Sequence, residues 1–349
     1  MTNPPFVSVV MTAYNEQQYV AEAVQSILDQ TYREFQLIVV DDASQDATPE
    51  ILQRLARSDS RIEVYRNAEN QGIARSANVG LSHAQSSLVA RMDSDDVSLP
   101  QRLRAQVDTF ASRPELVLCG GSTIRVDAAR RPRAIGEWPR ERDAIRWYAI
   151  FRPPVAQSAA MFRYDAKTRD LQYDEALNPA DDFGMWSRLL QRGEIEILPT
   201  PLIQYREHKR NATHTRRRQM TTNAAIVCRG NLLQVLPAFF EEHGETAATS
   251  IANLVERNPL SGPTDIGQTI ELLFAAERSY LASTDALPKQ TRHAIQQLTA
   301  RWLVQALASP DVAPRAQRLK AALALRRRIP RLLSEAVDFL NKRIRAKRF

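Results

Sequence analysis

Three pairs or clusters of acidic residues in this sequence have the residue types and spacing that metal and proton chemistry require. Residues 93–96 read Asp-Ser-Asp-Asp, residues 41–42 are Asp-Asp, and residues 181–182 are Asp-Asp. A hard divalent cation bound to a diphosphate takes oxygen ligands, with only one or two carboxylates from the protein. Acids at positions i and i+2 on an irregular strand end can therefore reach a metal and a ribose from one loop.

Each cluster also has a purely structural interpretation. An Asp-x-Asp triplet is common by chance, and Asp96 or Ser98 could simply begin the helix that is entered at Pro100. The pair Asp41 and Asp42 could cap a turn. Acids are stabilised at a helix N-terminus by the helix dipole, which would lower the pKa of Asp182 and keep it ionised. The clusters alone leave both interpretations open.

Glycine-rich phosphate loops are missing from the sequence. The first apolar run, 6–13, is followed by Tyr14, Asn15, Glu16 and Gln17, so the GxGxxG turn that brings a pyrophosphate to the backbone is not formed. A GxxxxGK[ST] loop does not occur either. A bound nucleotide must therefore be held mainly by side chains and a metal.

The first ~120 residues alternate strand and helix patterns. Strands are predicted at 6–13, 35–40, 62–65 and 88–92, and helices at 20–28, from 48 and from about 72. This alternation predicts an α/β fold in which helices cover a mostly parallel, Rossmann-like sheet. Ligands bind beyond the carboxyl ends of such strands, where the polar clusters of this sequence stand.

The remaining chain divides into a mixed segment and a helical region. Residues 119–205 contain prolines and short strands, with a helix predicted from Asp181 to Arg192. After about residue 213, long Ala- and Leu-rich stretches predict helices, interrupted near residues 259–263, 288 and 310–314. We therefore expect a nucleotide-sugar-binding catalytic domain at 1–212 and a helical C-terminal region at 213–349, with a basic tail at 315–349.

Four segments in order resemble family 2 glycosyltransferases of the GT-A fold, of the bacterial cell-surface polysaccharide type. They are Val7 to Glu16 (VSVVMTAYNE), Leu37 to Asp46 (LIVVDDASQD), Asn70 to Asn78 (NQGIARSAN) and Ala90 to Asp96 (ARMDSDD). The resemblance is good over residues 5–120 and looser to about 210. It implies an inverting enzyme that moves a sugar from a nucleotide diphosphate, in the first place UDP, to an acceptor hydroxyl.

The resemblance also implies roles for individual residues of the donor site. Asp93 would meet the ribose or the donor sugar beside Ser94, and Asp95 would bind Mn²⁺ or Mg²⁺. Asp42 would accept a hydrogen bond from the imide of the base. Arg75 is either a neighbour of the diphosphate or a solvated helix residue. The other residues expected to border the nucleotide sugar are Thr12, Ala13, Tyr14, Asn15, Asn70 and Gly72.

Residues 178–188 resemble the segment of the family in which an acidic pair opens a helix. Here the pair is Asp181-Asp182 where Glu-Asp is more usual. The alignment implies that Asp182 is the general base, with Asp181 as the other candidate. Inversion needs one carboxylate to take the proton of the acceptor hydroxyl, and it needs no protein nucleophile. The metal stabilises the leaving diphosphate.

Two more residues follow from the resemblance. His208, in the segment 204–213, is expected to be the second protein ligand of the metal or a contact to the diphosphate, although a histidine near arginines can also be an ordinary surface residue. Trp186 could stack on the face of an acceptor sugar, although tryptophans are as often part of the core.

Charge and cysteine content restrict the class of protein. Twelve Lys or Arg against two acids after residue 314 give this tail +10, so the total of +7 leaves −3 for the rest of the chain. A mildly acidic body argues against a nucleic-acid partner. Two cysteines and no long apolar run favour a cytoplasmic protein without a disulfide framework.

The basic tail has two open interpretations. Apolar residues at 323, 325, 329, 332, 333, 337, 340 and 344 recur at helical spacings. The tail could lie on the anionic inner face of the cell membrane and meet a lipid-linked or other saccharide acceptor. It could equally pack on the protein or form a homo-oligomer.

Two other functions compete with glycosyl transfer as interpretations of this sequence. A sugar-phosphate nucleotidylyltransferase would need a glycine-rich loop after the first strand, which is missing. A catalytically silent scaffold or membrane-surface binding module of the same fold is disfavoured by the acids at 95 and 182.

Overall fold

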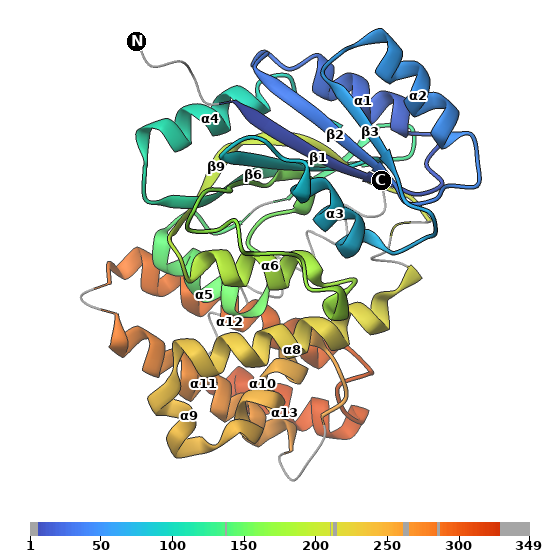
Figure 1. Ribbon diagram of the computed structural model, residues 1–349. Helices are drawn as coiled ribbons and strands as arrows, with labels where there is room; N and C mark the ends of the chain where they lie inside the picture. The colour runs from blue at the N-terminus through green and yellow to red at the C-terminus, as the bar shows by residue number, and fades with distance from the viewer. Residues whose placement is uncertain are drawn as a thin grey trace. The chain divides into compact units, whose positions relative to one another are not determined.

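The computed structural model describes residues 6–136, 138–209, 211, 215–260, 265–284 and 287–328. The chain divides into two compact units, which are described one at a time (Figure 1). The first unit comprises Met1–Arg140 and Pro154–Thr215, and the second comprises Glu141–Pro153 and Arg216–Phe349. The expected boundary between a catalytic domain at 1–212 and a helical region at 213–349 stays a prediction. Residues 212–214 lie outside the described part of the chain.

The first unit is built on one sheet with the strand order β3-β2-β1-β4-β8-β6-β9-β5, with β7 paired to β6. Pairing is parallel among β1 to β4, and β5, β7 and β8 join antiparallel. The strands are β1 (Val7–Ala13), β2 (Phe35–Asp41), β3 (Ile62–Arg66), β4 (Leu88–Asp93), β5 (Val97–Ser98), β6 (Leu116–Asp127), β7 (Pro132–Gly136), β8 (Met161–Arg163) and β9 (Glu194–Glu207).

Helices cover both faces of this sheet. They are α1 (Val20–Leu28), α2 (Thr48–Ser58), α3 (Ile73–Ser82), α4 (Arg102–Ser112) and α6 (Asp181–Leu190), with short 3₁₀ turns η1 (Gln157–Ala159) and η2 (Glu175–Leu177). Apolar residues of α1 and α4 share one core with Val7, Val9 and Met11. Helix α3 packs on the other face, where Gly80 lies against Val10 and Val40 (Figure 1). Strands buried on both faces read as continuous apolar runs, as β1 and β2 do.

The second unit is helical. Its elements are α5 (Arg142–Phe151), α8 (Arg217–Val235), α9 (Pro237–His243), α10 (Glu245–Glu256), α11 (Ile266–Ser283), α12 (Lys289–Ala308) and α13 (Arg315–Arg328). Trp147 of α5 is buried against Tyr280 and Trp302, and its indole N–H donates to Thr299 Oγ1 at 3.2 Å. This aromatic cluster is the centre of the unit. Among the described residues, no helix combines the length and the apolarity that crossing a membrane requires.

The fold class expected from the sequence is confirmed: an α/β sheet covered by helices is followed by a helical C-terminal region. Helix α2 begins with the predicted proline at its first turn. The breaks expected near prolines separate α10, α11, α12 and α13. Residues 329–349 of the basic tail lie outside the described residues.

Candidate active site

The carboxyl ends of β1, β2 and β4 align in the sheet and bring three of the predicted segments together. Thr12 pairs in register with Asp93 and with Val40, and Ala13 pairs with Asp41. Parallel strands must end at the same edge in this register, so the polar residues that follow them share one site.

The loop after β1 is fastened to the loop after β2 by Asn15. Its backbone N–H donates to Ser44 Oγ at 2.9 Å, and its Oδ1 accepts from the backbone N–H of Gln45 at 2.8 Å. Asn15 has a positive φ of 55°, which Asn tolerates better than most residues. The preceding Tyr14 is exposed, while Thr12 and Ala13 are buried. The aromatic ring of Tyr14 is therefore accessible to a ligand, whereas the side chains of Thr12 and Ala13 are not.

Asp42 is buried and organises the loop between β3 and α3. Its Oδ1 accepts from the backbone N–H of Gln71 at 2.8 Å and from Asn67 Nδ2 at 2.7 Å, and its Oδ2 accepts from the backbone N–H of Gly72 at 2.8 Å. Each carboxylate oxygen can accept two hydrogen bonds, so Oδ2 can still take a donor from a base. That contact stays a prediction. Asp41 Oδ1 accepts from Ser44 N–H at 3.1 Å, which is the turn-capping role expected for it.

The segment around Gly72 depends on the lack of a side chain there. Gly72 has φ +86°, and a Cβ at this position would lie 2.8 Å from Asn178 Nδ2. Asn70 Nδ2 lies 3.4 Å from the carbonyl oxygen of Asp42. Arg75 is exposed and its Nε lies 4.0 Å from Glu175 Oε1, so both interpretations of Arg75 remain open.

Asp93 is held by two donors from the segment at η1. Gln157 Nε2 donates to its Oδ1 and Ser158 Oγ to its Oδ2, both at 2.9 Å. Burial and the neighbouring charge of Asp95 raise the pKa of Asp93. Ser94 is buried between the two acids. Their contacts with a donor stay predictions.

Asp95 and His208 meet as the sequence predicts for two ligands of one metal. His208 Nε2 lies 2.9 Å from Asp95 Oδ2. Glu16 completes the group, because one ligand atom from each of the three residues lies within 4.8 Å of the others. Two carboxylate oxygens and one imidazole nitrogen are a donor set that suits Mn²⁺ or Mg²⁺, with the nitrogen favouring Mn²⁺. The residues therefore fit the cation that the sequence predicts.

Sequence reasoning missed Glu16 as a member of this group. The residue stands in the first family-like segment, where the sequence shows only that the turn after β1 lacks glycine. The signal that could have found it is its position: an acid three residues after the end of a buried strand lies at the same sheet edge as Asp95.

Asp181 and Asp182 open helix α6, as predicted. Asp182 Oδ1 accepts the backbone N–H of Phe183 at 2.7 Å, and Asp181 Oδ2 has no hydrogen-bond partner among the described residues. Burial, followed by the charge of Asp181, raises the pKa of Asp182 to about 7. Burial likewise raises the pKa of Asp181 to about 6. The expectation that the helix dipole would lower the pKa of Asp182 is wrong, because the loss of hydration outweighs the dipole.

A buried arginine acts electrostatically on these acids. Arg91 of β4 is fully buried and its Nη1 donates to the carbonyl of Val10 at 2.6 Å. Its guanidinium also lies 5.5 Å from the centre of the Tyr173 ring. The charge of Arg91 lowers the pKa of both Asp181 and Asp182, against the larger effect of burial. It therefore keeps the pair more acidic than burial alone would leave it.

The acceptor contact predicted for Trp186 does not fit the structure. The Trp186 side chain is fully buried, with ring centroids 5.8 Å from Phe162 and 6.3 Å from Tyr173. A sugar could not reach either face of the indole, so the stacking interpretation is wrong and Trp186 is a core residue on the buried side of α6.

A profile of the Glycosyl transferase family 2 matches residues 8–169. The putative glycosyltransferase EpsE of Bacillus subtilis is 31% identical over 196 residues, covering 55% of this chain and 69% of the relative. The chain therefore belongs to glycosyltransferase family 2.

Two solved structures share the fold of the chain. S. aureus TarS 1–349 in complex with UDP-GlcNAc has a TM-score of 0.55 at 17% identity, covering 90% of this chain and 89% of that one. The mannosyltransferase PcManGT from Pyrobaculum calidifontis, in complex with GDP-Man and Mn²⁺, has a TM-score of 0.52 at 19% identity, covering 92% and 87%. At these identities the likeness establishes the GT-A fold.

Proposed function

We propose that the protein is a metal-dependent, inverting glycosyltransferase. It moves a sugar from a nucleotide diphosphate, UDP in the first place, to an acceptor hydroxyl in the synthesis of a cell-surface polysaccharide or glycolipid. The observation that carries this proposal is the cluster of Glu16, Asp95 and His208, whose ligand atoms lie within 4.8 Å of one another at the sheet edge where donors bind in this fold.

The donor half of the site is assigned to the loops after β1 to β4 and to His208, which follows β9. Asp95 and His208, with Glu16, would hold Mn²⁺ or Mg²⁺, and Tyr14 offers an exposed ring to the base. When bound, the cation neutralises charge on the departing diphosphate. Asp93, which accepts hydrogen bonds from Gln157 and Ser158, would meet the ribose or donor sugar.

The acceptor half of the site is assigned to the start of α6. Asp182 takes the proton of the acceptor hydroxyl while that oxygen forms its bond to the anomeric carbon. The bond from the anomeric carbon to the diphosphate oxygen breaks at the same time, and the diphosphate leaves with the electron pair. A base works best when its pKa lies near the working pH, and burial raises the pKa of Asp182 to about 7.

The direct test is a donor panel. Purified protein is incubated with UDP-, GDP- and dTDP-sugars plus Mn²⁺ or EDTA, and the released nucleoside diphosphate is measured. We expect release from one class of donor that requires the cation, slow with water and faster with an acceptor. The Asp182→Asn variant is the matched control, since it keeps the metal group and loses the base.

The same panel separates the proposal from a catalytically silent scaffold. A scaffold would bind a nucleotide or a surface and release no diphosphate from any donor. Absence of release, together with calorimetric evidence that a nucleotide binds, would refute the enzyme and favour the scaffold.

We further propose that the enzyme works at the cytoplasmic face of an anionic membrane, on a lipid-linked acceptor. Leu319 and Leu323 are 54% and 63% exposed and lie one turn apart on α13, next to Arg315 and Lys320. Apolar residues beside basic ones on a helix favour an interfacial position, and each basic residue near such a surface contributes about 1 kcal/mol.

Vesicle sedimentation tests the membrane role. Full-length protein is mixed with anionic or neutral vesicles at low and high salt, and binding to anionic vesicles at low salt is expected. Leu319→Ser with Leu323→Ser should weaken it, whereas Ile135→Ser, which removes an equally exposed apolar residue from β7, should not. Protein that ignores anionic vesicles at low salt would refute this role. Loss of an oligomer in the double variant would favour subunit pairing instead.

A further inference from the structure

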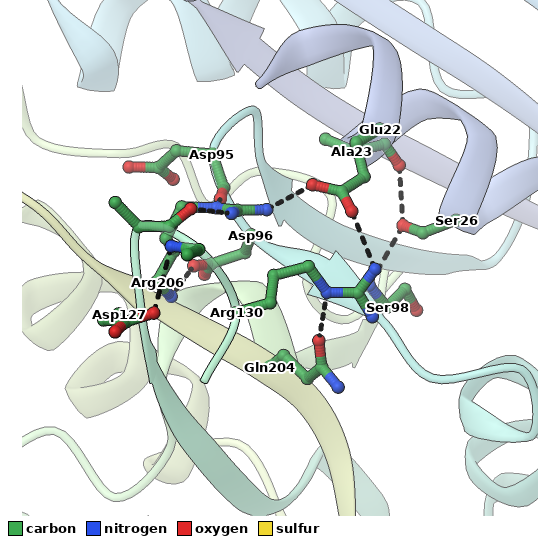
Figure 2. A network of polar contacts seen from close by, with 12 residues as sticks. Glu22, Ala23, Ser26, Asp95, Asp96, Ser98, Asp127, Arg130, Gln204 and Arg206 are labelled. Carbon is green, nitrogen blue, oxygen red and sulfur yellow. Dashed lines mark hydrogen bonds and ion pairs between the residues drawn. The ribbon is translucent and has the colours of Figure 1, made fainter. Parts of the chain in front are cut away.

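Arg206 of β9 is almost fully buried and donates in three directions (Figure 2). Its Nε donates to the backbone carbonyl of Asp95 at 2.7 Å, and its Nη1 donates to that of Ala128 at 2.8 Å. Its Nη2 forms an ion pair with Glu22 Oε2 at 2.5 Å. The guanidinium thus joins the acidic loop after β4 to α1 and to the turn between β6 and β7.

The same side chain also reaches the other predicted metal ligand through an aromatic ring. The Arg206 guanidinium lies 4.6 Å from the centre of the Tyr19 ring, and the centre of that ring lies 5.1 Å from that of His208. Tyr19 is therefore held between the arginine and the imidazole. Arg206 contacts the backbone of one ligand directly and the ring of the other through a single residue.

Backbone contacts of Arg206 fix the chain on both sides of the site. Its N–H donates to Asp96 Oδ1 at 2.8 Å, and its carbonyl accepts from Asn211 Nδ2 at 3.0 Å. Asn211 Oδ1 in turn accepts the backbone N–H of His208 at 2.6 Å. The backbone of Arg206 therefore binds Asp96, in the loop that carries Asp95, and it is connected through Asn211 to the backbone of His208.

The charge of Arg206 is compensated, which matters beside a cation site. Glu22 binds Arg206 with one carboxylate oxygen and Arg130 Nη1 with the other, the latter at 2.7 Å. Burial raises the pKa of Glu22, but the hydrogen bonds from Arg130 and Arg206 outweigh it and lower that pKa. An ionised Glu22 offsets the guanidinium charge. Arg206 can therefore hold the Asp95 backbone in place with less electrostatic repulsion of the metal.

We propose that Arg206, with Tyr19 and Glu22, is a positioning unit that sets the distance between Asp95 and His208 and thereby the affinity for the divalent cation. The inference rests on the proposed metal site and adds the residues that orient its ligands. Partners that orient metal ligands typically change metal affinity by about 10- to 100-fold when removed.

The chain offers a matched pair of variants for the test. Arg206→Met and Arg130→Met each remove a guanidinium that binds Glu22, but only Arg206 contacts Asp95 and Tyr19. Arg206→Lys keeps the charge and cannot reproduce donation in three directions. Tyr19→Leu removes the ring between Arg206 and His208 without touching the buried arginine, in case Arg206→Met fails to fold.

Mn²⁺ affinity is measured by electron paramagnetic resonance, in the presence of whichever of UDP or GDP the wild type binds more tightly. We expect Arg206→Met and Arg206→Lys to lose about 10- to 100-fold, and Tyr19→Leu at least about 10-fold. Glu22→Gln should lose at most about five-fold, and Arg130→Met should match the wild type. Nucleotide affinity in EDTA is the second reading, because a positioning role leaves it unchanged and general misfolding does not.

The outcomes separate this inference from the function on which it rests. If the wild type binds Mn²⁺, Asp95→Ala does not, and both Arg206→Lys and Tyr19→Leu bind it like the wild type, the positioning role is overturned and the metal site stands. If the wild type binds no Mn²⁺, the metal site and this inference are both overturned. Equal losses in Arg206→Met and Arg130→Met would also overturn it, since the effect would then come from charge alone.

Discussion

Two of the three acidic clusters of the first unit, residues 93–96 and residues 181–182, differ in the hydrogen bonds that hold their carboxylates. In the first cluster, donors hold the acids in place: Asp93 accepts from Gln157 and Ser158, and Asp95 lies against His208. In the second, Asp182 Oδ1 accepts the backbone N–H of its neighbour Phe183, and Asp181 Oδ2 has no hydrogen-bond partner among the described residues.

This difference matches the two kinds of chemistry proposed for the clusters. A metal ligand must keep one geometry, which is achieved by hydrogen bonds that fix the carboxylate and its backbone. A general base must accept a proton, which is easier where few donors already bind the carboxylate and lost hydration raises its pKa. Similar residue types therefore gain different roles from their surroundings, and each role can be tested by removing one acid.

The largest effect is expected from Asp95→Ala. Removal of a ligand that also contacts His208 should abolish metal-dependent donor binding and lower kcat/KM by about three orders of magnitude or more, because a bound cation contributes several kcal/mol to charge stabilisation. Calorimetry with and without Mn²⁺ measures the binding, and circular dichroism checks the fold. An unchanged affinity for UDP or GDP with Mn²⁺ would remove Asp95 from the metal site.

Asp182→Asn should separate turnover from binding. The variant keeps nearly the same volume and loses the proton acceptor, so nucleotide binding should survive while kcat falls by about two or more orders of magnitude. Steady-state kinetics with the best donor measure kcat. Asp181→Asn is the matched control, and a larger loss of kcat in it than in Asp182→Asn would transfer the base to Asp181.

The same substitution should raise the stability of the metal-free protein, and only above acidic pH. The pKa of Asp182 is raised to about 7 in the folded protein, against ~4 for an unfolded Asp. Between these values the folded state binds the extra proton, so stability falls as pH rises through this window and stays low above it.

Asp182→Asn removes that loss. We expect its Tm to exceed that of the wild type at pH 8 by about 2 °C or more, the shift that about 1 kcal/mol produces in a chain of this size. At pH 4.5 the difference should shrink. Thermal unfolding at the two pH values measures it, and a variant that is less stable than the wild type at pH 8 would show that Asp182 contributes structure instead.

A smaller effect is expected from Gly72→Ala. This variant tests whether the loop before α3 packs against Asn178, three residues before Asp181. The φ of +86° and the 2.8 Å approach to Asn178 Nδ2 should make alanine cost about 1–3 kcal/mol. Gly230→Ala is the matched control, because a Cβ there meets nothing within 4 Å and should stabilise α8 by about 0.5–1 kcal/mol. Urea unfolding measures both, and equal effects would contradict the strain assigned to Gly72.

Much of the first unit could be predicted from the sequence because its strands are short apolar runs that end in polar clusters. The strand–helix alternation then predicts the parallel pairing, in which Thr12 aligns with Asp93. The start of α6 at Asp181 was equally visible. These features depend on local patterns, which a single sequence carries.

Features that depend on distant contacts could not be predicted. Burial of Trp186 against Phe162 and Tyr173, and the raised pKa of Asp182 that follows from burial, arise from packing between segments far apart in the chain. The joining of Arg206 to Glu22 spans 184 residues. Glu16 belongs to a recognisable segment, but the residues that share its metal group, Asp95 and His208, are distant in the sequence.

The stereochemistry of the product tests the central claim most directly, because one base and no protein nucleophile require inversion. The anomeric configuration of the product made from an α-linked donor is read from its proton coupling constant by nuclear magnetic resonance. A β-linked product, formed by the wild type and lost in Asp182→Asn, is the predicted result. An α-linked product would contradict the single displacement and the role of Asp182 as its base.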